Sequence, residues 1–330
     1  TDFDGIISGV PVINWVNLQT AGTRMGLALL ENGWISPEKV QLVHDAVLNA
    51  CDALDGLEDG VVSNYVACEK AFDVNTLACA NNDDENCLNP GDIAVIKQLH
   101  NPSELPFKVA NGQQHYPGWG LSGEATAGTG PVGGWVAWQT GETAPELPPQ
   151  PGNSRAWLYG SGAVQYFFAQ DPDYDVTQFD PEALKERMKI VSELMDSTNP
   201  DLSEFSKHGG KLIVFENMAD YAQSPYAGIE YVQAVKDTLG DEQTEQFLRL
   251  YVNPGTDHMG GGAPAAVNFL DALTSWVEHD NAPGNLVAAQ QDNKAPFSIT
   301  AERPLCQYPE YPHYVGGDEA KAESFECRKP

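Results

Sequence analysis

Hydrophobic positions in the second half of the chain fall into two spacings, and each spacing predicts a different kind of element. Apolar residues recur at helical spacing over residues 184–195, directly after Asp180-Pro181, a pair typical of a helix start. Residues 211–215 form a short apolar run that follows two glycines, which indicates a buried parallel strand. This part of the chain is therefore predicted to fold as a helix followed by a strand.

The alternation continues toward the C-terminus. Apolar residues at helical spacing over 229–239 predict a second helix, the run 247–252 predicts a second strand, and residues 269–277 predict a third helix. Near the start of the chain, residues 3–11 predict a short buried strand that ends in a turn. Strands and helices in this order predict a parallel α/β layer with right-handed crossovers.

The first half of the chain is less regular. Pro37 follows a serine, and the apolar residues after it predict one more helix. Periodicity then fades between Cys51 and Pro151, a segment rich in glycine, proline, asparagine and tryptophan. We therefore expect a loop-dominated insertion over this segment.

The charge balance narrows the classes of partner. The 330 residues include 18 lysines and arginines against 47 aspartates and glutamates, a formal net charge of −29 at pH 7. A chain this acidic gains nothing from counterion release on a polyanion, so we expect no nucleic acid partner, and anionic membrane surfaces are disfavoured for the same reason. No apolar run approaches the length of a membrane-spanning helix, so no membrane association is expected.

Six cysteines, an even number, lie mostly in acidic, loop-like sequence and indicate disulfides formed in an oxidising compartment. Six cysteines allow fifteen pairings, and spacing alone does not choose among them. No C-x-x-C pair occurs and no histidine lies at zinc-finger spacing from a cysteine, so zinc is not expected. We favour the local pairing because it has the shortest loop closures: Cys51 with Cys68, Cys79 with Cys87, and Cys306 with Cys327.

Candidate chemistry lies where the two predicted strands end, because ligands of open α/β sheets bind at the carboxyl ends of the strands. The loop after residues 211–215 carries Asp220, and the loop after residues 247–252 carries His258. An acid followed by a histidine is the second half of the Ser…Asp…His order of α/β-hydrolases, in which the carboxylate orients the imidazole that accepts the serine proton. The alternative is that Asp220 caps the next helix and His258 is an ordinary turn residue.

A nucleophile is missing from this pattern. The motif G-x-S-x-G of the nucleophile turn does not occur. Ser161 stands directly between two glycines without the spacer residues, Ser122 lacks the final glycine, and neither follows a predicted buried strand. The sequence therefore shows two members of a triad without the third.

The acidic loop between Cys51 and Val61 carries a different signal. Asp52, Asp55 and Asp59 alternate with glycines that allow tight turns, and Ca²⁺ prefers six to eight oxygen ligands from carboxylates and carbonyls. The EF-hand spacing is not met, because the bidentate glutamate at the twelfth position is absent. The alternative is a solvated acidic loop.

Five motifs, in order along the chain, resemble the tannase family of α/β-hydrolases, which includes fungal tannases, feruloyl esterases and a bacterial mono-(hydroxyethyl) terephthalate hydrolase. The resemblance covers nearly the whole chain, and five ordered motifs are far more specific than any one of them. Residues 2–11 resemble the strand after the nucleophile helix, 51–61 the calcium loop, 167–175 the closing segment of the lid, Ala219-Asp220 the acid loop, and 254–262 the histidine loop.

The resemblance implies an α/β-hydrolase fold interrupted by a large, loop-rich lid. Residues 1–12 and 197–330 would form the C-terminal part of the parallel sheet with its flanking helices, and residues 13–196 would form the lid. In this arrangement Asp220 would be the triad acid and His258 the general base.

The resemblance also implies a calcium ion with a structural role in the lid, away from the ester bond that is cut. Its ligands would be the side chains of Asp52, Asp55 and Asp59 together with the backbone carbonyls of Leu57 and Val61.

Two departures from the family pattern concern the nucleophile. The family's serine lies a short helix upstream of the first motif, so the resemblance implies that the segment preceding Thr1 supplies it. The family also places a cysteine directly after the catalytic histidine, disulfide-bonded to a cysteine directly before the serine, and Met259 occupies that position here. Packing would then have to hold the serine and the histidine together in place of that disulfide.

The sequence leads to two hypotheses. The first is a secreted or periplasmic carboxylic-ester hydrolase of the tannase and feruloyl esterase type, which acts on small-molecule aromatic esters of phenolic acids. The second is a non-catalytic or degenerate calcium-stabilised homologue that binds aromatic ligands through its tryptophans, which are Trp119, Trp135, Trp138 and Trp157.

Overall fold

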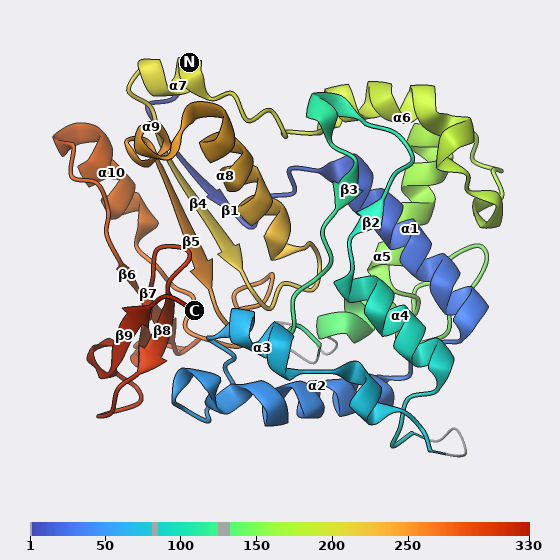
Figure 1. Ribbon diagram of the computed structural model, residues 1–330, viewed down its shortest axis with the longest axis horizontal. Helices are drawn as coiled ribbons and strands as arrows, with labels where there is room; N and C mark the ends of the chain where they lie inside the picture. The colour runs from blue at the N-terminus through green and yellow to red at the C-terminus, as the bar shows by residue number, and fades with distance from the viewer. Residues whose placement is uncertain (1, 81–84, 125–132) are drawn as a thin grey trace.

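A three-stranded parallel sheet organises one half of the computed structural model, which describes residues 2–80, 85–124 and 133–330. The strands are β1 (Gly5–Gly9), β4 (Lys211–Asn217) and β5 (Leu248–Asn253), in the order β1-β4-β5 (Figure 1). The three strands predicted from the sequence are confirmed. The first was predicted to be buried, but β1 is largely half-buried, because among the described residues it pairs with β4 along one edge only.

Helices cover both faces of the sheet. Because successive side chains of a strand point to opposite faces, Leu212 and Val214 of β4 pack against α8 (Pro225–Leu239), whereas Ile213 packs against α10 (Phe269–His279). The helices predicted over 229–239 and 269–277 are confirmed, and so is the parallel α/β layer with its flanking helices.

The segment between β1 and β4 is mostly helical and lies beside the sheet (Figure 1). Its longest described helix, α1 (Trp15–Asn32), packs against α5 (Arg155–Gly162) and α4 (Pro90–His100). The helix predicted from Pro37 is α2 (Pro37–Cys51), and the one predicted after Asp180 is α6 (Pro181–Met195). Both begin with a side-chain cap and a proline in the first turn, as the sequence indicated.

Between Cys51 and Pro151 most of the described residues lie outside helices and strands, which confirms the loop-dominated insertion expected there, but the segment also contains helices that the sequence did not indicate. There the chain forms α3 (Tyr65–Ala71) and α4. A capping box begins α4, in which the side chains of Asn89 and Asp92 each accept a hydrogen bond from the other residue's backbone N–H. These helices have 7 and 11 residues and bury only a few side chains each, so they leave little hydrophobic periodicity in the sequence.

The two ends of this helical segment lie side by side. The backbone N–H of Ser197 donates to the carbonyl of Ile13 at 2.8 Å, and Asp196 accepts a hydrogen bond from the backbone N–H of Val16 at 3.0 Å. The chain therefore leaves the sheet near residue 12 and returns near residue 197. The division into residues 1–12 and 197–330 as core and 13–196 as lid stays a prediction.

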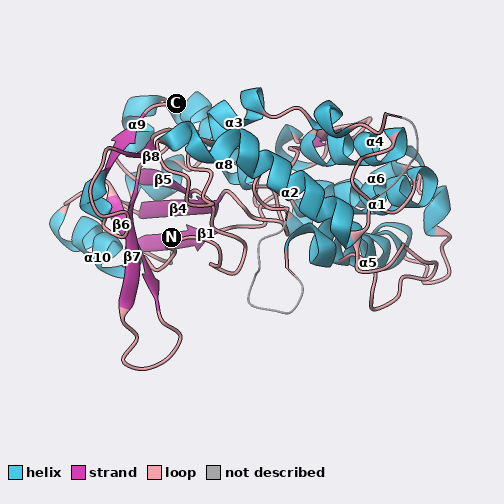
Figure 2. Cartoon of the chain, turned by 90° about the horizontal axis from the view of Figure 1, so that it is seen from below, coloured by secondary structure: helices cyan, strands magenta, loops and turns pink. Residues whose placement is uncertain are grey.

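The C-terminal part adds two antiparallel strand pairs, β6 (Leu286–Gln291) with β7 (Ile299–Leu305), and β8 (Tyr311–Tyr314) with β9 (Phe325–Arg328). The β6–β7 hairpin projects away from the parallel sheet (Figure 2). The other short elements are α7 (Ser203–Lys207), α9 (Asp241–Glu245), β2 (Ser103–Glu104), β3 (His115–Tyr116), single helical turns at Asp52–Asp55, Val74–Leu77, Ala110–Gly112, Val176–Gln178 and Ala322–Ser324, and π-helical segments at Val136–Thr140 and Ala163–Ala169.

Three disulfides join neighbouring parts of the chain, and the local pairing favoured from the sequence is confirmed. No cysteine is left free. The bonded pairs are Cys51–Cys68, Cys79–Cys87 and Cys306–Cys327, with Cα–Cα distances of 5.0, 4.9 and 5.7 Å.

Within the described ranges, no helix combines the length and the apolar character needed to cross a membrane.

Candidate active site

The loop that follows β4 holds Asp220 in a buried, fixed position. Asp220 is 2% exposed, and its Oδ1 atom accepts hydrogen bonds from the backbone N–H groups of Ala222 at 2.7 Å and Gln223 at 3.0 Å. These donors replace water around one carboxylate oxygen and leave the other available to a second partner. The N–H of Ala219 also donates to the carbonyl of Thr256 at 3.0 Å, which ties this loop to the loop after β5.

The loop that follows β5 is shaped by a second buried acid next to His258. Asp257 is fully buried, and its Oδ1 atom accepts hydrogen bonds from the N–H groups of Met259 at 2.9 Å and Gly261 at 2.8 Å. The side chain of Asn217, at the end of β4, donates to the Asp257 carbonyl at 2.8 Å. A tight turn fastened to the neighbouring strand therefore directs the imidazole.

The structure brings Asp220 and His258 into direct contact, with 2.7 Å between Oδ2 and Nδ1. An ionised carboxylate only accepts hydrogen bonds, so Nδ1 carries the hydrogen and Nε2 remains available as a proton acceptor. The hydrogen bond to Asp220 raises the pKa of His258 against an opposing effect of burial, and the negative charges of Asp220 and Asp257 add to the rise. The residues selected by the strand-end argument thus form a pair, and their catalytic role stays a prediction.

A buried glutamate, Glu216, is connected to Asp220 through Gln223. Glu216 of β4 is fully buried, and its Oε2 atom accepts a hydrogen bond from the Gln223 side chain at 2.9 Å. Burial and the nearby charge of Asp220 raise the pKa of Glu216 well above its usual range. Gly228 makes room for it, because a Cβ atom there would lie 1.9 Å from Oε1 of Glu216.

Aromatic side chains flank the imidazole. The ring of Trp138 lies 6.0 Å from the His258 ring between centroids, and the ring of Tyr221 lies 6.5 Å from it. Tyr159 contacts the other side of Trp138 at 5.8 Å, and the guanidinium of Arg155 lies 5.3 Å from the Trp138 ring centroid. Trp138, Tyr159, Tyr221 and Arg155 are called the aromatic wall below. Sequence reasoning named only Trp138, because no spacing signal relates these positions to His258.

A cavity of about 240 Å³ adjoins His258 on the side of β1. Its lining includes Val10, directly after β1, and Met259, which is 61% exposed. Met259 therefore projects from the histidine loop at the position where the resemblance places a cysteine, and it makes the rim of the cavity apolar.

The serines singled out in the sequence, Ser122 and Ser161, form no hydrogen bond with His258. Every serine of the chain lies within the described residues, and none has a hydrogen bond to His258. Ser161 is buried within α5, and Ser122 is buried with a positive φ of 83°. The absence of a nucleophile from this chain stays a prediction.

The four tryptophans of the second hypothesis have different environments. Trp135 and Trp157 are 1% and 0% exposed and pack in two separate hydrophobic cores, so the expectation that they hold a ligand is wrong. Trp138 belongs to the aromatic wall, and Trp119 lines a different cavity. Burial of large rings in cores explains most of this tryptophan content.

The acidic loop adopts a conformation in which its aspartates already have partners. Asp52 accepts backbone hydrogen bonds from Asp59 at 3.2 Å and Gly60 at 3.0 Å, and Asp59 forms a 2.6 Å ion pair with Arg303. Across residues 2–80, 85–124 and 133–330, no group of three or more acidic, histidine or cysteine side chains is arranged to hold a metal ion. The oxygen donors suit calcium chemically, but coordination would require these contacts to be exchanged.

The third aspartate of the loop, Asp55, is the most deeply buried of the three. It is 3% exposed and accepts hydrogen bonds from the N–H groups of Leu57 and Ser63 at 3.1 and 3.0 Å. Burial raises the pKa of Asp55 to about 6 in spite of these donors, and the charge of Asp59 contributes to the rise. Calcium binding by this loop stays a prediction.

The family model and the relatives that match this chain agree with one another. The family model described as tannase and feruloyl esterase matches residues 1–328. An uncharacterized esterase of Agrobacterium fabrum is 32% identical over 98% of this chain and 59% of its own length. A mono(2-hydroxyethyl) terephthalate hydrolase of Piscinibacter sakaiensis is 30% identical over 99% of this chain and 60% of its own length. The chain therefore spans about 60% of the length of these relatives.

Solved structures show the same fold. The crystal structure of feruloyl esterase B from Aspergillus oryzae superposes with a TM-score of 0.82 at 23% identity, over 99% of this chain and 64% of the other. At this identity the likeness concerns the fold, and it agrees with the α/β-hydrolase class expected from the sequence.

Proposed function

Because the chain belongs to the tannase and feruloyl esterase family, we propose that it provides the acid and base of a carboxylic-ester hydrolase active site. The observation that carries this proposal is the 2.7 Å contact between His258 Nδ1 and Asp220 Oδ2, formed by loops at the carboxyl ends of neighbouring parallel strands. An oriented imidazole beside a buried carboxylate is the arrangement that proton transfer from a serine hydroxyl requires.

In the proposed reaction, a serine hydroxyl attacks the ester carbonyl while His258 Nε2 accepts the hydroxyl proton. The tetrahedral intermediate collapses to an acyl-enzyme as the histidine returns that proton to the leaving alcohol, and water then repeats the sequence to release the acid. Asp220 keeps the imidazole in the correct tautomer and stabilises the imidazolium without being protonated. The raised pKa of His258 makes it a stronger proton acceptor during attack.

The serine is proposed to come from a segment outside residues 1–330. Support comes from the serines of this chain, none of which hydrogen-bonds to His258. It also comes from the apolar cavity beside Val10 and Met259, which leaves the imidazole accessible from the β1 side.

The proposed substrates are esters of aromatic acids, for which the aromatic wall supplies support. Trp138 and Tyr221 flank the imidazole, so a flat acyl group could stack against them while its ester carbonyl lies near His258. Arg155 has no salt bridge in the described parts of the chain and favours acyl rings that carry an acceptor or a carboxylate. Feruloyl and terephthaloyl esters both meet this description.

The experiment that tests the function is steady-state hydrolysis of methyl ferulate by a complete polypeptide containing residues 1–330. His258→Ala is expected to lower kcat by about 10³-fold or more with a small change in KM, because the general base acts only in the transition state. Near-normal turnover would refute the assignment. Failure of the wild type to react with a fluorophosphonate probe would instead favour the second hypothesis, a binding protein without a nucleophile.

We further propose that calcium stabilises the acidic loop. The buried, uncompensated Asp55 supports this, because a cation beside it would remove the cost of its charge. Thermal unfolding with excess calcium and with excess chelator tests it, and equal melting temperatures would contradict it.

The three disulfides support a further proposal, that the protein works in an extracellular or periplasmic compartment. Loss of all three bonds in protein isolated from its native compartment would contradict it.

A further inference from the structure

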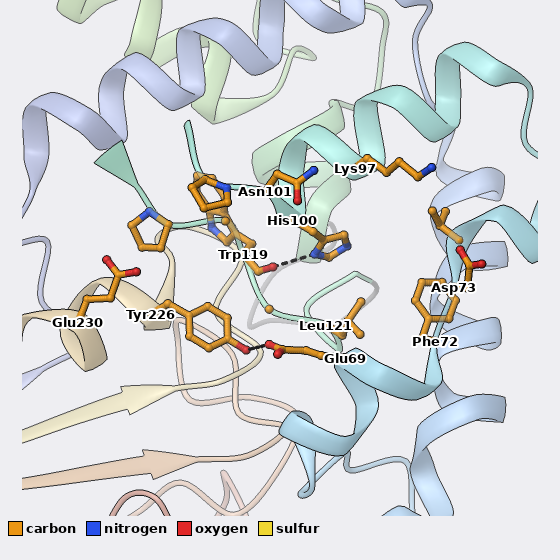
Figure 3. A pocket seen from close by; sticks show the side chains of 15 residues that line it. Glu69, Phe72, Asp73, Lys97, His100, Asn101, Trp119, Leu121, Tyr226 and Glu230 are labelled. Atoms are coloured by element: carbon orange, nitrogen blue, oxygen red, sulfur yellow. Dashed lines mark hydrogen bonds between the residues drawn. The ribbon is translucent and has the colours of Figure 1, made fainter. Parts of the chain in front are cut away.

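A second cavity lies apart from the His258 site. It is open to solvent and has a volume of about 480 Å³ between α3, α4, α8 and the segment 117–121, within the range of small-molecule sites (Figure 3). Neither Asp220, His258 nor any member of the aromatic wall lines it. The proposed ester hydrolysis therefore does not use this cavity.

The floor of the cavity is apolar, aromatic and buried. Trp119 and Leu121 are 5% and 7% exposed, and the ring of Tyr226 forms one side (Figure 3). The Nδ1 atom of His100 donates to the Trp119 carbonyl at 2.7 Å, which fixes the segment that carries the indole. A preformed floor of this kind suits a ligand with an apolar body. Val74, Pro102, Pro117 and Phe72 complete the apolar lining.

The rim of the cavity carries an excess of negative charge. Three exposed carboxylates, those of Glu69, Asp73 and Glu230, face a single ammonium group, that of Lys97. Figure 3 shows Tyr226 and Glu230 on one side of the cavity and Asp73 and Lys97 on the opposite side.

These charges are not neutralised locally. In the described ranges, none of the three carboxylates forms a salt bridge with lysine or arginine: Glu69 accepts the Tyr226 hydroxyl, and Glu230 contacts His115 at 3.0 Å. The Lys97 ammonium donates to the Asn75 side chain at 2.8 Å instead of pairing with an acid. A cationic ligand would therefore meet these carboxylates without displacing a lysine or an arginine from them.

We propose that this cavity binds a small organic cation, an amine or a quaternary ammonium group carried on an apolar body. The positive group would lie beside the ring of Tyr226, between Glu230 and Glu69, where the ring quadrupole and the two carboxylates attract a cation, and Asp73 on the opposite side adds to the negative potential. The apolar body would cover the floor, which a hydrated inorganic ion would leave empty. Anions are disfavoured both by the rim and by the net charge of −29.

The test uses the chain of residues 1–330 and three probes of similar size and different charge. Isothermal titration calorimetry at low salt is expected to show saturable one-to-one binding of benzyltrimethylammonium, with a Kd of about 1 mM or below. Benzyl alcohol is expected to bind at least about fivefold more weakly, benzoate is expected not to bind, and added sodium chloride is expected to weaken binding of the cation.

Charge variants that preserve side-chain size locate the binding. Glu230→Gln and Asp73→Asn are each expected to raise the Kd of the cation about two- to fivefold, and Lys97→Gln is expected to lower it by a similar factor. Glu193→Gln on α6 is the matched control, because Glu193 is exposed and lies outside the cavity lining. Circular dichroism verifies that each variant is folded.

Three outcomes would overturn the proposal. The first is no saturable heat with benzyltrimethylammonium up to about 20 mM. The second is equal or tighter binding of benzyl alcohol or benzoate. The third is a Kd that changes no more in the Glu230 and Asp73 variants than in the Glu193 control.

Discussion

Replacing Asp55 with asparagine tests how the acidic loop is held when no metal is present. Burial raises the pKa of Asp55 from 3.8 to about 6, a difference of 6 − 3.8, or about 2.2 units. At about 1.4 kcal/mol per unit, ionising this buried group costs the native state about 3 kcal/mol of stability. Asparagine has nearly the same shape and cannot ionise, so the variant removes the pH-dependent part of this cost.

The sign follows from the direction of the shift. The pKa of Asp55 is higher in the folded state than in the unfolded state, so the native state binds the proton more tightly. The stabilising contribution of the protonated form is complete below about pH 3.8 and is lost as the pH rises through about 6. The free energy of unfolding of the wild type should therefore fall relative to that of Asp55→Asn by about 3 kcal/mol between these values, and then level off.

Urea unfolding in the presence of chelator, from about pH 3.5 to pH 7.5, measures this difference. Any fixed cost of the substitution, such as a backbone hydrogen bond to Leu57 or Ser63 that asparagine accepts less well, shifts the variant equally at every pH and cancels. Asp45→Asn on the exposed face of α2 is the matched control and should show no such trend. A constant gap between wild type and Asp55→Asn would refute the argument from burial, and so would a wild type that gains relative stability as pH rises.

Two further variants test the close packing at Gly228 and the contribution of one disulfide. Gly228→Ala is expected to destabilise the fold by about 1–3 kcal/mol in denaturant unfolding, because its Cβ would lie 1.9 Å from Glu216 Oε1; an unchanged midpoint would contradict the close packing. Replacing Cys51 and Cys68 with serine opens a loop of 17 residues and should cost about 3 kcal/mol by loop entropy, measured the same way. A loss of much less than about 1 kcal/mol would contradict that estimate.

The sheet and its helices could be predicted because their hydrophobic patterns are long and local. The strand at 211–215 follows two glycines and is buried on both faces, and α8 buries residues at helical spacing. α1 was not assigned, because half of its contact surface consists of small and polar residues such as Thr20, Gly22 and Thr23 that carry little hydrophobic signal. Its position is set by close backbone approach: a Cβ at Gly22 would lie 2.7 Å from the carbonyl of Ala156 on α5.

The candidate site, like the fold, could be predicted from the sequence only in part. Asp220 and His258 follow directly from strand ends, whose position at one edge of a parallel sheet is a property of the topology. Trp138 and Arg155 reach the site from the helical segment, about a hundred residues away in sequence, and only the tertiary fold relates them to His258. Gln223 donates its backbone N–H to Asp220 and its side-chain amide to Glu216, and this buried connection likewise depends on tertiary geometry that periodicity does not encode.

The most direct test of the central claim is the rate of ester hydrolysis by Asp220→Asn in a complete polypeptide that contains residues 1–330. Asparagine keeps the shape of the side chain but presents no negative charge to His258 Nδ1, now at 2.7 Å from a carboxylate oxygen. If the pair is the acid and base of a serine esterase, kcat should fall by about 10⁴-fold while KM changes little. A kcat within about threefold of the wild type would contradict the account.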